Sequence, residues 1–111
     1  MKKYRTHTCG ELNKSHKGKV VSLSGWINKK RDHGNLLFVD LRDNYGITQC
    51  VIEKSNSIFK EIEKCSLETV IKISGSVIER SSETINKNIS TGEIEIKINE
   101  IDILGKTKEL P

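Results

Sequence analysis

Hydrophobic and polar residues alternate in five stretches of the chain, which is the period of a half-buried β-strand. These stretches are 20–27, 36–41, 47–52, 70–78 and 94–103. Gly25 lies in the middle of the first stretch and suggests a bend or a bulge there. In the last stretch the hydrophobic phase slips by one residue near Asn99–Glu100, which predicts a second irregularity, a β-bulge.

The hydrophobic period changes between residues 55 and 66. Ile58, Phe59, Ile62 and Cys65 recur there at the spacing of one helix face, with Lys and Glu between them. This pattern predicts an amphipathic helix of about three turns. Polar stretches with Gly, Asn and Ser predict turns or loops at 29–35, 43–46 and 80–92.

The order of elements is strand, strand, strand, helix, strand, strand. A single all-β domain is expected for 111 residues. The order predicts an OB-fold, a five-stranded Greek-key barrel with one helix between strands 3 and 4. An SH3-like barrel rarely carries such a helix, and a ferredoxin-like sheet needs two. An OB-fold binds its ligand on strands 2 and 3 and on the loops that join strands 1–2 and 4–5.

The predicted binding face carries groups that suit a nucleic-acid base. Phe38 offers a flat apolar ring, and Gln49 is a polar side chain among apolar neighbours. Lys29, Lys30 and Arg31 offer cations for phosphate. A ring for stacking, a polar edge and nearby cations are the elements of single-strand recognition. The alternative is that Phe38 packs in the core and the basic run is a solvated turn.

Charge and composition narrow the classes of partner. The formal net charge is +4, and residues 1–54 carry 11 basic and 5 acidic side chains. A basic first half favours an anionic partner such as nucleic acid. However, 15 of the 19 basic residues are lysines, so charge alone does not identify the partner. No apolar run approaches the ~20 residues of a membrane span, and no secretory signal follows Met1.

The cysteines, histidines and acids show no pattern of a metal or catalytic centre. The three cysteines are widely spaced and lack a C-x-x-C pair, so a reducing cytoplasm is the expected compartment. His7 and Cys9, with Cys50 or His16, lack the spacing of zinc ligands. The acids that could form a catalytic pair are Asp40, Asp43, Glu93 and Glu95. No nucleophile–base pair accompanies them, so we expect surface charge, no catalytic centre and no bound metal.

Several segments share the pattern of a known family. They are 4–12 (YRTHTCGEL), 25–34 (GWINKKRDHG), 37–43 (LFVDLRD) with Gly46 and Gln49, and 85–86 with 91–95 (TGEIE). Together they resemble the N-terminal anticodon-binding domain of bacterial aspartyl-tRNA synthetases, from about Tyr4 to the end. The frame from Gly25 to Gly46 is shared with the asparaginyl and lysyl enzymes of the same class II subgroup. The opening C-G-x-L and the R-D-x-G turn are more specific to the bacterial aspartyl branch.

The resemblance implies that the barrel holds a tRNA anticodon loop and assigns a role to each matching residue. Phe38 is expected to stack on the central uridine, with Arg31 and Gln49 as its edge and backbone contacts. Glu95 is expected to accept hydrogen bonds from a base edge, a role that residue chemistry alone did not give it. Asn86, in the loop between strands 4 and 5, is expected to be a further contact.

His33 departs from one branch of the family. R-D-H-G resembles the non-discriminating aspartyl enzymes, which charge both tRNA(Asp) and tRNA(Asn), whereas R-D-L-G resembles the discriminating ones. The resemblance therefore implies that His33 tolerates either pyrimidine at the third anticodon base. The alternative is a solvated turn histidine with no such role.

The resemblance also implies a larger parent protein, an aspartate–tRNA(Asp/Asn) ligase whose ATP and Mg sites lie in a catalytic domain absent from this chain. Residues 1–105 are then the OB-fold domain, without a cofactor, and residues 106–111 the start of a hinge. The parent is expected to be a cytoplasmic homodimer and the fragment a monomer. The open alternatives are a domain of an asparaginyl or lysyl enzyme, a generic single-strand binder, and a partner-binding barrel that binds no RNA.

Overall fold

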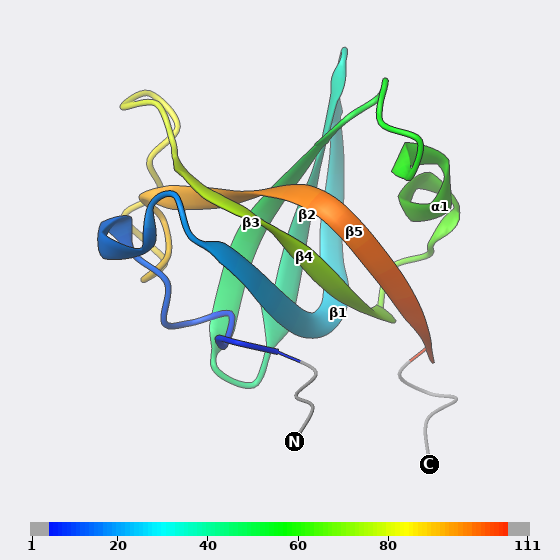
Figure 1. Cartoon of the computed structure of the whole chain (residues 1–111), viewed down its shortest axis with the longest axis horizontal. Coiled ribbons are helices and arrows are strands. Elements are labelled where there is room, and N and C mark those ends of the chain that lie inside the picture. The colour runs from blue at the N-terminus through cyan, green and yellow to red at the C-terminus, as the bar shows by residue number, and fades with distance from the viewer. Residues whose placement is uncertain (1–4, 107–111) are drawn as a thin grey trace.

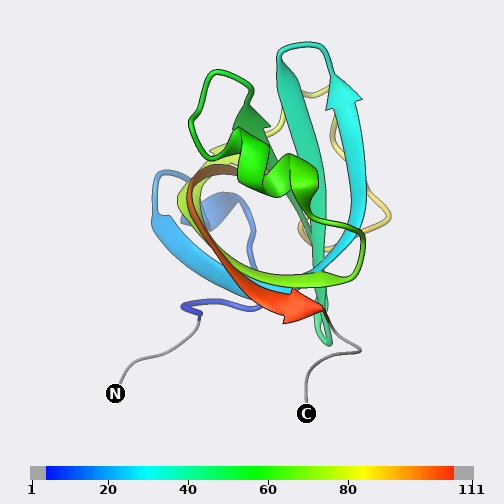
Figure 2. The ribbon, with the colours of Figure 1, turned by 90° about the vertical axis from the view of Figure 1, so that its right-hand side faces the viewer.

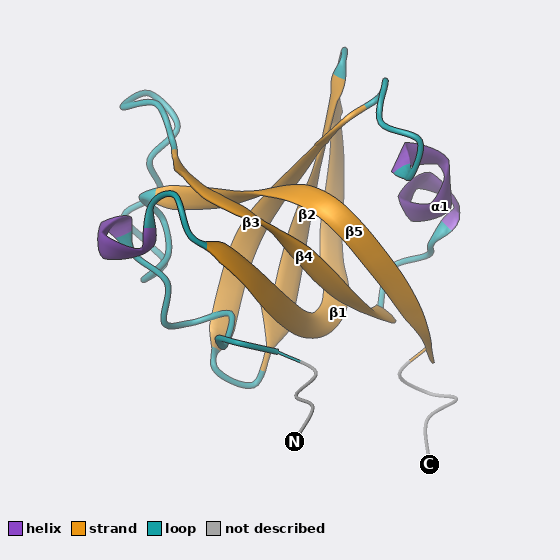
Figure 3. Cartoon of the chain, viewed as in Figure 1, coloured by secondary structure: helices purple, strands orange, loops and turns teal. Residues whose placement is uncertain are grey.

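The computed structural model describes residues 5–106, which form a closed five-stranded barrel (Figure 1). The elements are a 3₁₀ turn, η1 (Lys14–His16), the strands β1 (Val20–His33), β2 (Leu36–Asp43), β3 (Gly46–Glu53), β4 (Thr69–Glu79) and β5 (Ile94–Lys106), and the helix α1 (Phe59–Lys64) between β3 and β4. Strands dominate the ribbon (Figure 3). The all-β class and the OB-fold with one helix between the third and fourth strands are confirmed.

The strands follow one another around the barrel in the order β1-β2-β3-β5-β4. All neighbours are antiparallel except β3 and β5, which are parallel. β1 takes part twice, because its first half pairs with β4 and its second half with β2. Gly25 lies where β1 changes partners, and a side chain there would clash with the carbonyl oxygen of Arg42 on β2. The bulge in β1 itself falls between Ile27 and Lys29.

The core is built from the inward-facing residues of every strand, as alternation requires. On β2 these are Leu37, Val39 and Leu41, so Phe38 and Asp40 face outward as expected. α1 covers one end of the barrel with Phe59 and Ile62, which both join the core cluster (Figure 2).

The bulge expected in the last strand is confirmed. Ser74 pairs with Glu100 while its neighbour Gly75 pairs with Ile98, so Asn99 is the extra residue of β5. β4 and β5 lie very close beside this bulge, since a side chain at Gly75 would clash with the carbonyl oxygen of Lys97.

Two expectations about element lengths were wrong. The predicted turn at 29–35 is mostly strand, because β1 continues to His33 and only Gly34 (φ 66°) and Asn35 form the turn. None of residues 29–33 joins the core cluster, although Val39 and Leu37 opposite them on β2 do, so no hydrophobic alternation marks this part of β1. The helix is also shorter than 55–66, since the side chain of Asn56 accepts a hydrogen bond from the backbone of Ile58 and closes a turn just before α1.

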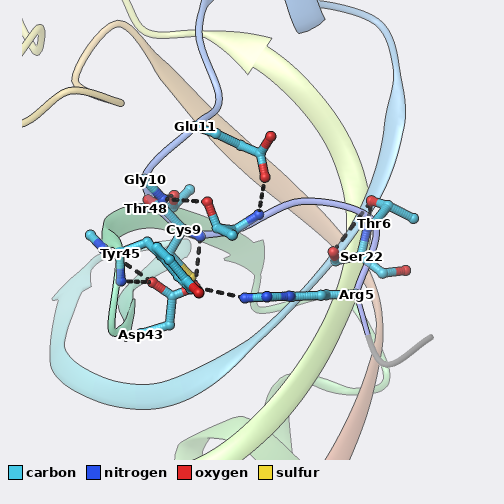
Figure 4. Close-up of polar contacts among 11 residues, drawn as sticks. Arg5, Thr6, Cys9, Gly10, Glu11, Ser22, Asp43, Tyr45 and Thr48 are labelled. Atoms are coloured by element: carbon cyan, nitrogen blue, oxygen red, sulfur yellow. Dashed lines mark hydrogen bonds and ion pairs between the residues drawn. The ribbon is translucent and has the colours of Figure 1, made fainter.

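The N-terminal segment fastens the turn between β2 and β3 (Figure 4). Asp43 accepts backbone hydrogen bonds from Cys9 (2.9 Å) and, across the turn, from Tyr45 (2.8 Å) and Gly46 (3.1 Å). Arg5 lies 3.7 Å from the same carboxylate and its guanidinium stacks over the Tyr45 ring. These contacts fix one end of the β2–β3 hairpin, whose middle carries Phe38 and Gln49.

β5 ends at Lys106, and residues 107–111 of the expected hinge lie outside the described residues. No helix among residues 5–106 is long and apolar enough to cross a membrane.

Candidate nucleic-acid interface

A hollow of about 510 Å³ opens on the outer face of the barrel. Its walls come from the β1–β2 hairpin, from β3 and β5, and from the loop 80–92 that is yellow in Figure 1. The residues that line it are Arg31, His33, Phe38, Gln49, Arg80, Ser81, Thr84, Asn86 and Glu95. The structure thus brings together Arg31, His33, Phe38, Gln49, Asn86 and Glu95, which were all singled out from the sequence.

Cross-strand pairing explains why these side chains meet. Arg31 on β1 lies opposite Phe38 on β2, and Asp40 on β2 lies opposite Gln49 on β3. Directly opposed residues of an antiparallel pair share a face, so all four point outward. Glu95 joins them because β5 runs parallel to β3 with Ile96 beside Cys50.

A chain of hydrogen bonds connects the polar groups of the hollow. Arg31 Nη2 donates to Asp40 Oδ1 (2.7 Å) and to Gln49 Oε1 (2.8 Å). Gln49 Nε2 donates to Glu95 Oε1 (2.7 Å). Arg31 Nε is buried and has no hydrogen-bond partner among the described residues. The site therefore holds a buried N–H donor without a protein partner, beside the Glu95 carboxylate, which can accept further hydrogen bonds.

Phe38 belongs to this surface rather than to the core. Its ring is half-buried and is absent from the core cluster. The His33 ring meets it edge-on at 5.2 Å between centroids, and the Arg31 guanidinium carbon lies 5.9 Å from its centroid. The alternative that Phe38 is a core ring is therefore wrong. An aromatic face between a histidine and an arginine can stack with a nucleobase.

Arg80 is the site residue that sequence reasoning missed. It is the first residue of the polar loop 80–92, where no pattern distinguishes it from other loop residues. Its Nε donates to the carbonyl of Ile94 (3.0 Å) and its Nη1 to that of Thr84 (3.0 Å). Burial lowers the pKa of Arg80, while the charges of Glu95 and Asp40 act in the opposite direction. The guanidinium thus closes the base of the loop and adds a second cation to the hollow.

The loop that carries Asn86 is folded on itself. The Asn86 backbone N–H donates to the carbonyl of Gly92 (3.0 Å), and its side chain accepts from the backbone of Asn88 (2.9 Å). Ser90 at the far side of the loop donates to the Gly10 carbonyl (2.9 Å), which ties the loop to the N-terminal segment. These bonds hold Asn86 at the rim of the hollow.

Lys29 and Lys30 do not line the hollow. Lys29 is exposed and lies opposite Asp40, so it shares the outer face with the site. Lys30 lies opposite Val39 and faces the other way, where its ammonium donates to the carbonyls of Glu63 and Cys65 at the end of α1. Phosphate contact by these two lysines stays a prediction, and only Lys29 stands beside the hollow.

Residues 5–106 contain no group of three or more His, Cys, Asp or Glu side chains that could hold a metal ion. All three cysteines are free and buried. Burial raises the pKa of Cys9 and Cys50 far above that of an exposed thiol, with the carboxylates of Asp43 and Asp40 adding to the effect. The thiols are accordingly inert groups of the core.

Comparison with known proteins identifies similar chains. A family model described as an OB-fold nucleic acid binding domain, and named for the tRNA anticodon, matches residues 21–104. An aspartate–tRNA(Asp/Asn) ligase of Pelagibacter ubique (strain HTCC1062) is 66% identical over 111 residues, covering 100% of this chain and 19% of that protein. The solved aspartyl tRNA synthetase of Entamoeba histolytica is 27% identical, with a TM-score of 0.74 over 91% of this chain and 21% of that one.

A third similar structure is an OBody, AM3L09, bound to hen egg-white lysozyme. It is 25% identical, with a TM-score of 0.79 over 96% of this chain and 100% of that one. The chain spans about a fifth of the length of the curated relatives it matches (19%). The resemblance to bacterial aspartyl-tRNA synthetases is confirmed. Because the family model matches most of its length, this chain belongs to the OB-fold nucleic acid binding domain family named for the tRNA anticodon.

Proposed function

We propose that this chain is the anticodon-binding domain of an aspartate–tRNA(Asp/Asn) ligase and that the hollow receives an unstacked anticodon base. The observation that carries the proposal is the meeting of Phe38, Arg31, Gln49 and Glu95 on one face. These residues supply a ring for stacking, cationic and amide donors, and a carboxylate acceptor for a base edge.

The charges around the hollow also favour a neutral base over a free anion such as phosphate. The hollow of about 510 Å³ contains two arginines, but two carboxylates, Glu95 and Asp40, accompany them. A site for free phosphate would gain nothing from these acids. A base edge presents N–H groups as well as acceptors, so it can use both kinds of charge. Phosphates that flank the base would meet Lys29 and Arg80 at the rim.

The finer proposal is that the domain accepts both tRNA(Asp) and tRNA(Asn). His33 lies at the tip of the β1–β2 hairpin, exposed, with its ring against Phe38. A residue there adjoins the position of the base that stacks on Phe38. This contact supports the proposal that His33 meets one neighbour of the central base and tolerates either pyrimidine at the third position.

What we propose for the parent protein rests on the names of the relatives, which are aspartate–tRNA(Asp/Asn) ligases. The parent is then an enzyme that joins aspartate to tRNA, with ATP and Mg bound outside this domain. We expect the domain alone to bind RNA without catalysing the reaction. We also expect it to be a monomer, and the parent to form a cytoplasmic homodimer through other parts.

The test is binding of the chain to three RNA stem-loops at one fixed, moderate salt concentration, because salt dominates RNA affinity. The anticodons are GUC, GUU and a scrambled triplet. We expect GUC and GUU to bind alike and the scrambled loop to bind about tenfold more weakly, since it loses charged hydrogen bonds. A His33→Leu variant is the matched control, expected to prefer GUC over GUU while still rejecting the scrambled loop.

Other binding results would favour other functions. A wild-type preference for GUC over GUU keeps the aspartyl domain and removes the dual specificity. A preference for GUU favours the asparaginyl alternative, and equal binding of all three loops a generic single-strand binder. Absence of salt-sensitive RNA binding would contradict the proposal altogether.

A further inference from the structure

Asp40 lies at the centre of the site without lining the hollow. It occupies the middle strand of three, opposite Lys29 on β1 and Gln49 on β3. Its side chain is 18% exposed and accepts a hydrogen bond of 2.7 Å from Arg31 Nη2. Arg31 is a diagonal neighbour across the β1–β2 pair, a distance that long side chains span.

The Arg31 nitrogen that Asp40 holds is also the one that orients Gln49. Nη2 donates to Gln49 Oε1, and Gln49 Nε2 donates in turn to Glu95. A primary amide has one acceptor end and one donor end. With a cation at its acceptor end and a carboxylate at its donor end, the Gln49 amide has one favourable orientation. The orientation of the Gln49 amide therefore depends on the Arg31 guanidinium staying against the sheet.

The ion pair with Asp40 holds the Arg31 guanidinium against the sheet. Without this carboxylate, the nearest acid to the Arg31 guanidinium in the network is Glu95, and a direct pair between them would displace the Gln49 amide. The buried Arg31 Nε, which has no partner among the described residues, would move with it. Preorganised groups bind more selectively because they lose less freedom when the ligand arrives.

We propose that Asp40 is a positioning residue for anticodon recognition: it fixes Arg31, and through Arg31 the Gln49 amide and the Glu95 carboxylate, without touching the RNA. This inference rests on the proposed function. It makes a prediction opposite to that of simple electrostatics. Removing a negative charge beside an anionic ligand should strengthen binding, whereas removing a positioning residue should weaken it and reduce selectivity.

The experiment compares Asp40→Asn with the matched control Asp32→Asn, using the GUC and scrambled stem-loops at fixed salt. Asp32 lies on the same hairpin but is exposed and pairs with Lys54, away from the hollow. Both substitutions remove one negative charge. We expect Asp40→Asn to lower the ratio of the two affinities about tenfold, as expected for loss of a charged hydrogen-bond network. Asp32→Asn should leave the ratio unchanged.

A second variant separates positioning from general stability. Arg31→Lys keeps the charge but loses the planar fork that bridges two acceptors. In that background Asp40→Asn should cause no further loss of selectivity, because the two residues act as one unit. Thermal unfolding of each variant identifies the temperature range in which all of them are folded. Should Asp40→Asn not fold, Asp40→Thr replaces it, because threonine also lacks the carboxylate and suits a strand, and an unchanged affinity ratio with an unchanged Gln49 amide spectrum would overturn the proposal.

The NMR signals of the Gln49 side-chain amide in the free chain give a readout that needs no RNA. Asp40→Asn should shift and broaden them, while Asp32→Asn should leave them in place. If Asp40→Asn keeps the affinity ratio, or tightens binding to both loops equally, the proposal is overturned. If the wild type fails to distinguish the loops, the proposed function fails instead, and an unmoved Gln49 amide in Asp40→Asn then overturns the positioning role separately.

Discussion

Replacing Phe38 with alanine separates the loss of an RNA-stacking ring from the loss of a structural one. The ring is half-buried, lies outside the core cluster, and contacts the side chains of His33 and Arg31. Its neighbour Val39 on the same strand is fully buried and faces the core. Val39→Ala is therefore the matched control, one residue away and on the opposite face of β2.

The expected magnitudes differ for the two positions. Loss of a stacked base costs about 1–3 kcal/mol of binding, which weakens RNA affinity between about fivefold and about 150-fold. At Phe38 the folded state loses the partial burial of the ring and its contacts with His33 and Arg31, about 1–2 kcal/mol. Val39→Ala removes two buried methyl groups and leaves a cavity, so it should cost about 2 kcal/mol of unfolding free energy.

The assay pairs a urea unfolding curve with titration of the GUC stem-loop for each variant. Phe38→Ala should lose affinity and keep most of its stability, and Val39→Ala should lose stability and keep its affinity. If Phe38→Ala lost as much stability as Val39→Ala while binding GUC normally, the assignment of Phe38 to the RNA surface would be refuted.

Three further outcomes are expected. A Gly92→Ala variant should weaken stem-loop binding by distorting the loop 80–92, because its side chain would clash with the Asn86 carbonyl; unchanged affinity would contradict the role of the loop. Asp43→Ala should lower the unfolding free energy by about 2–4 kcal/mol in urea, since it removes a carboxylate bound by three backbone N–H groups; a loss below that would show that the N-terminal segment is held by other contacts. Because burial raises the pKa of Cys9 and Cys50, both stay protonated at pH 8 and should react with a thiol reagent only after unfolding; rapid labelling of the native chain would contradict their burial.

The hydrophobic pattern was sufficient for the barrel because the barrel is what buries hydrophobic residues. It located the bulge at Asn99, since the isoleucines of β5 change phase where the extra residue is inserted. It failed at the second half of β1, from Lys29 to His33, which pairs with β2 but contributes no side chain to the core. Backbone hydrogen bonds hold that part, and they leave no mark on residue polarity.

The candidate site was predictable only where its residues stood out. Phe38 could be recognised because it is an aromatic residue at an outward-facing position of its strand. Gln49 could be recognised because it is polar among apolar neighbours. Glu95 alternates with isoleucines like any surface acid, so only the family resemblance gave it a role. Arg80 sits in a polar loop of similar residues, and its contact with the carbonyls of Ile94 and Thr84 is a product of the fold.

The most direct measurement is an NMR titration of the isotope-labelled chain with the GUC stem-loop. We expect the shift changes to concentrate on the residues of the hollow, with contacts between the protons of the Phe38 ring and those of the central uridine. The signals of the α1 end, where Lys30 donates to Glu63, should stay unchanged. Shift changes centred on α1, or saturable binding without any change at Phe38 and Gln49, would contradict anticodon recognition at the hollow.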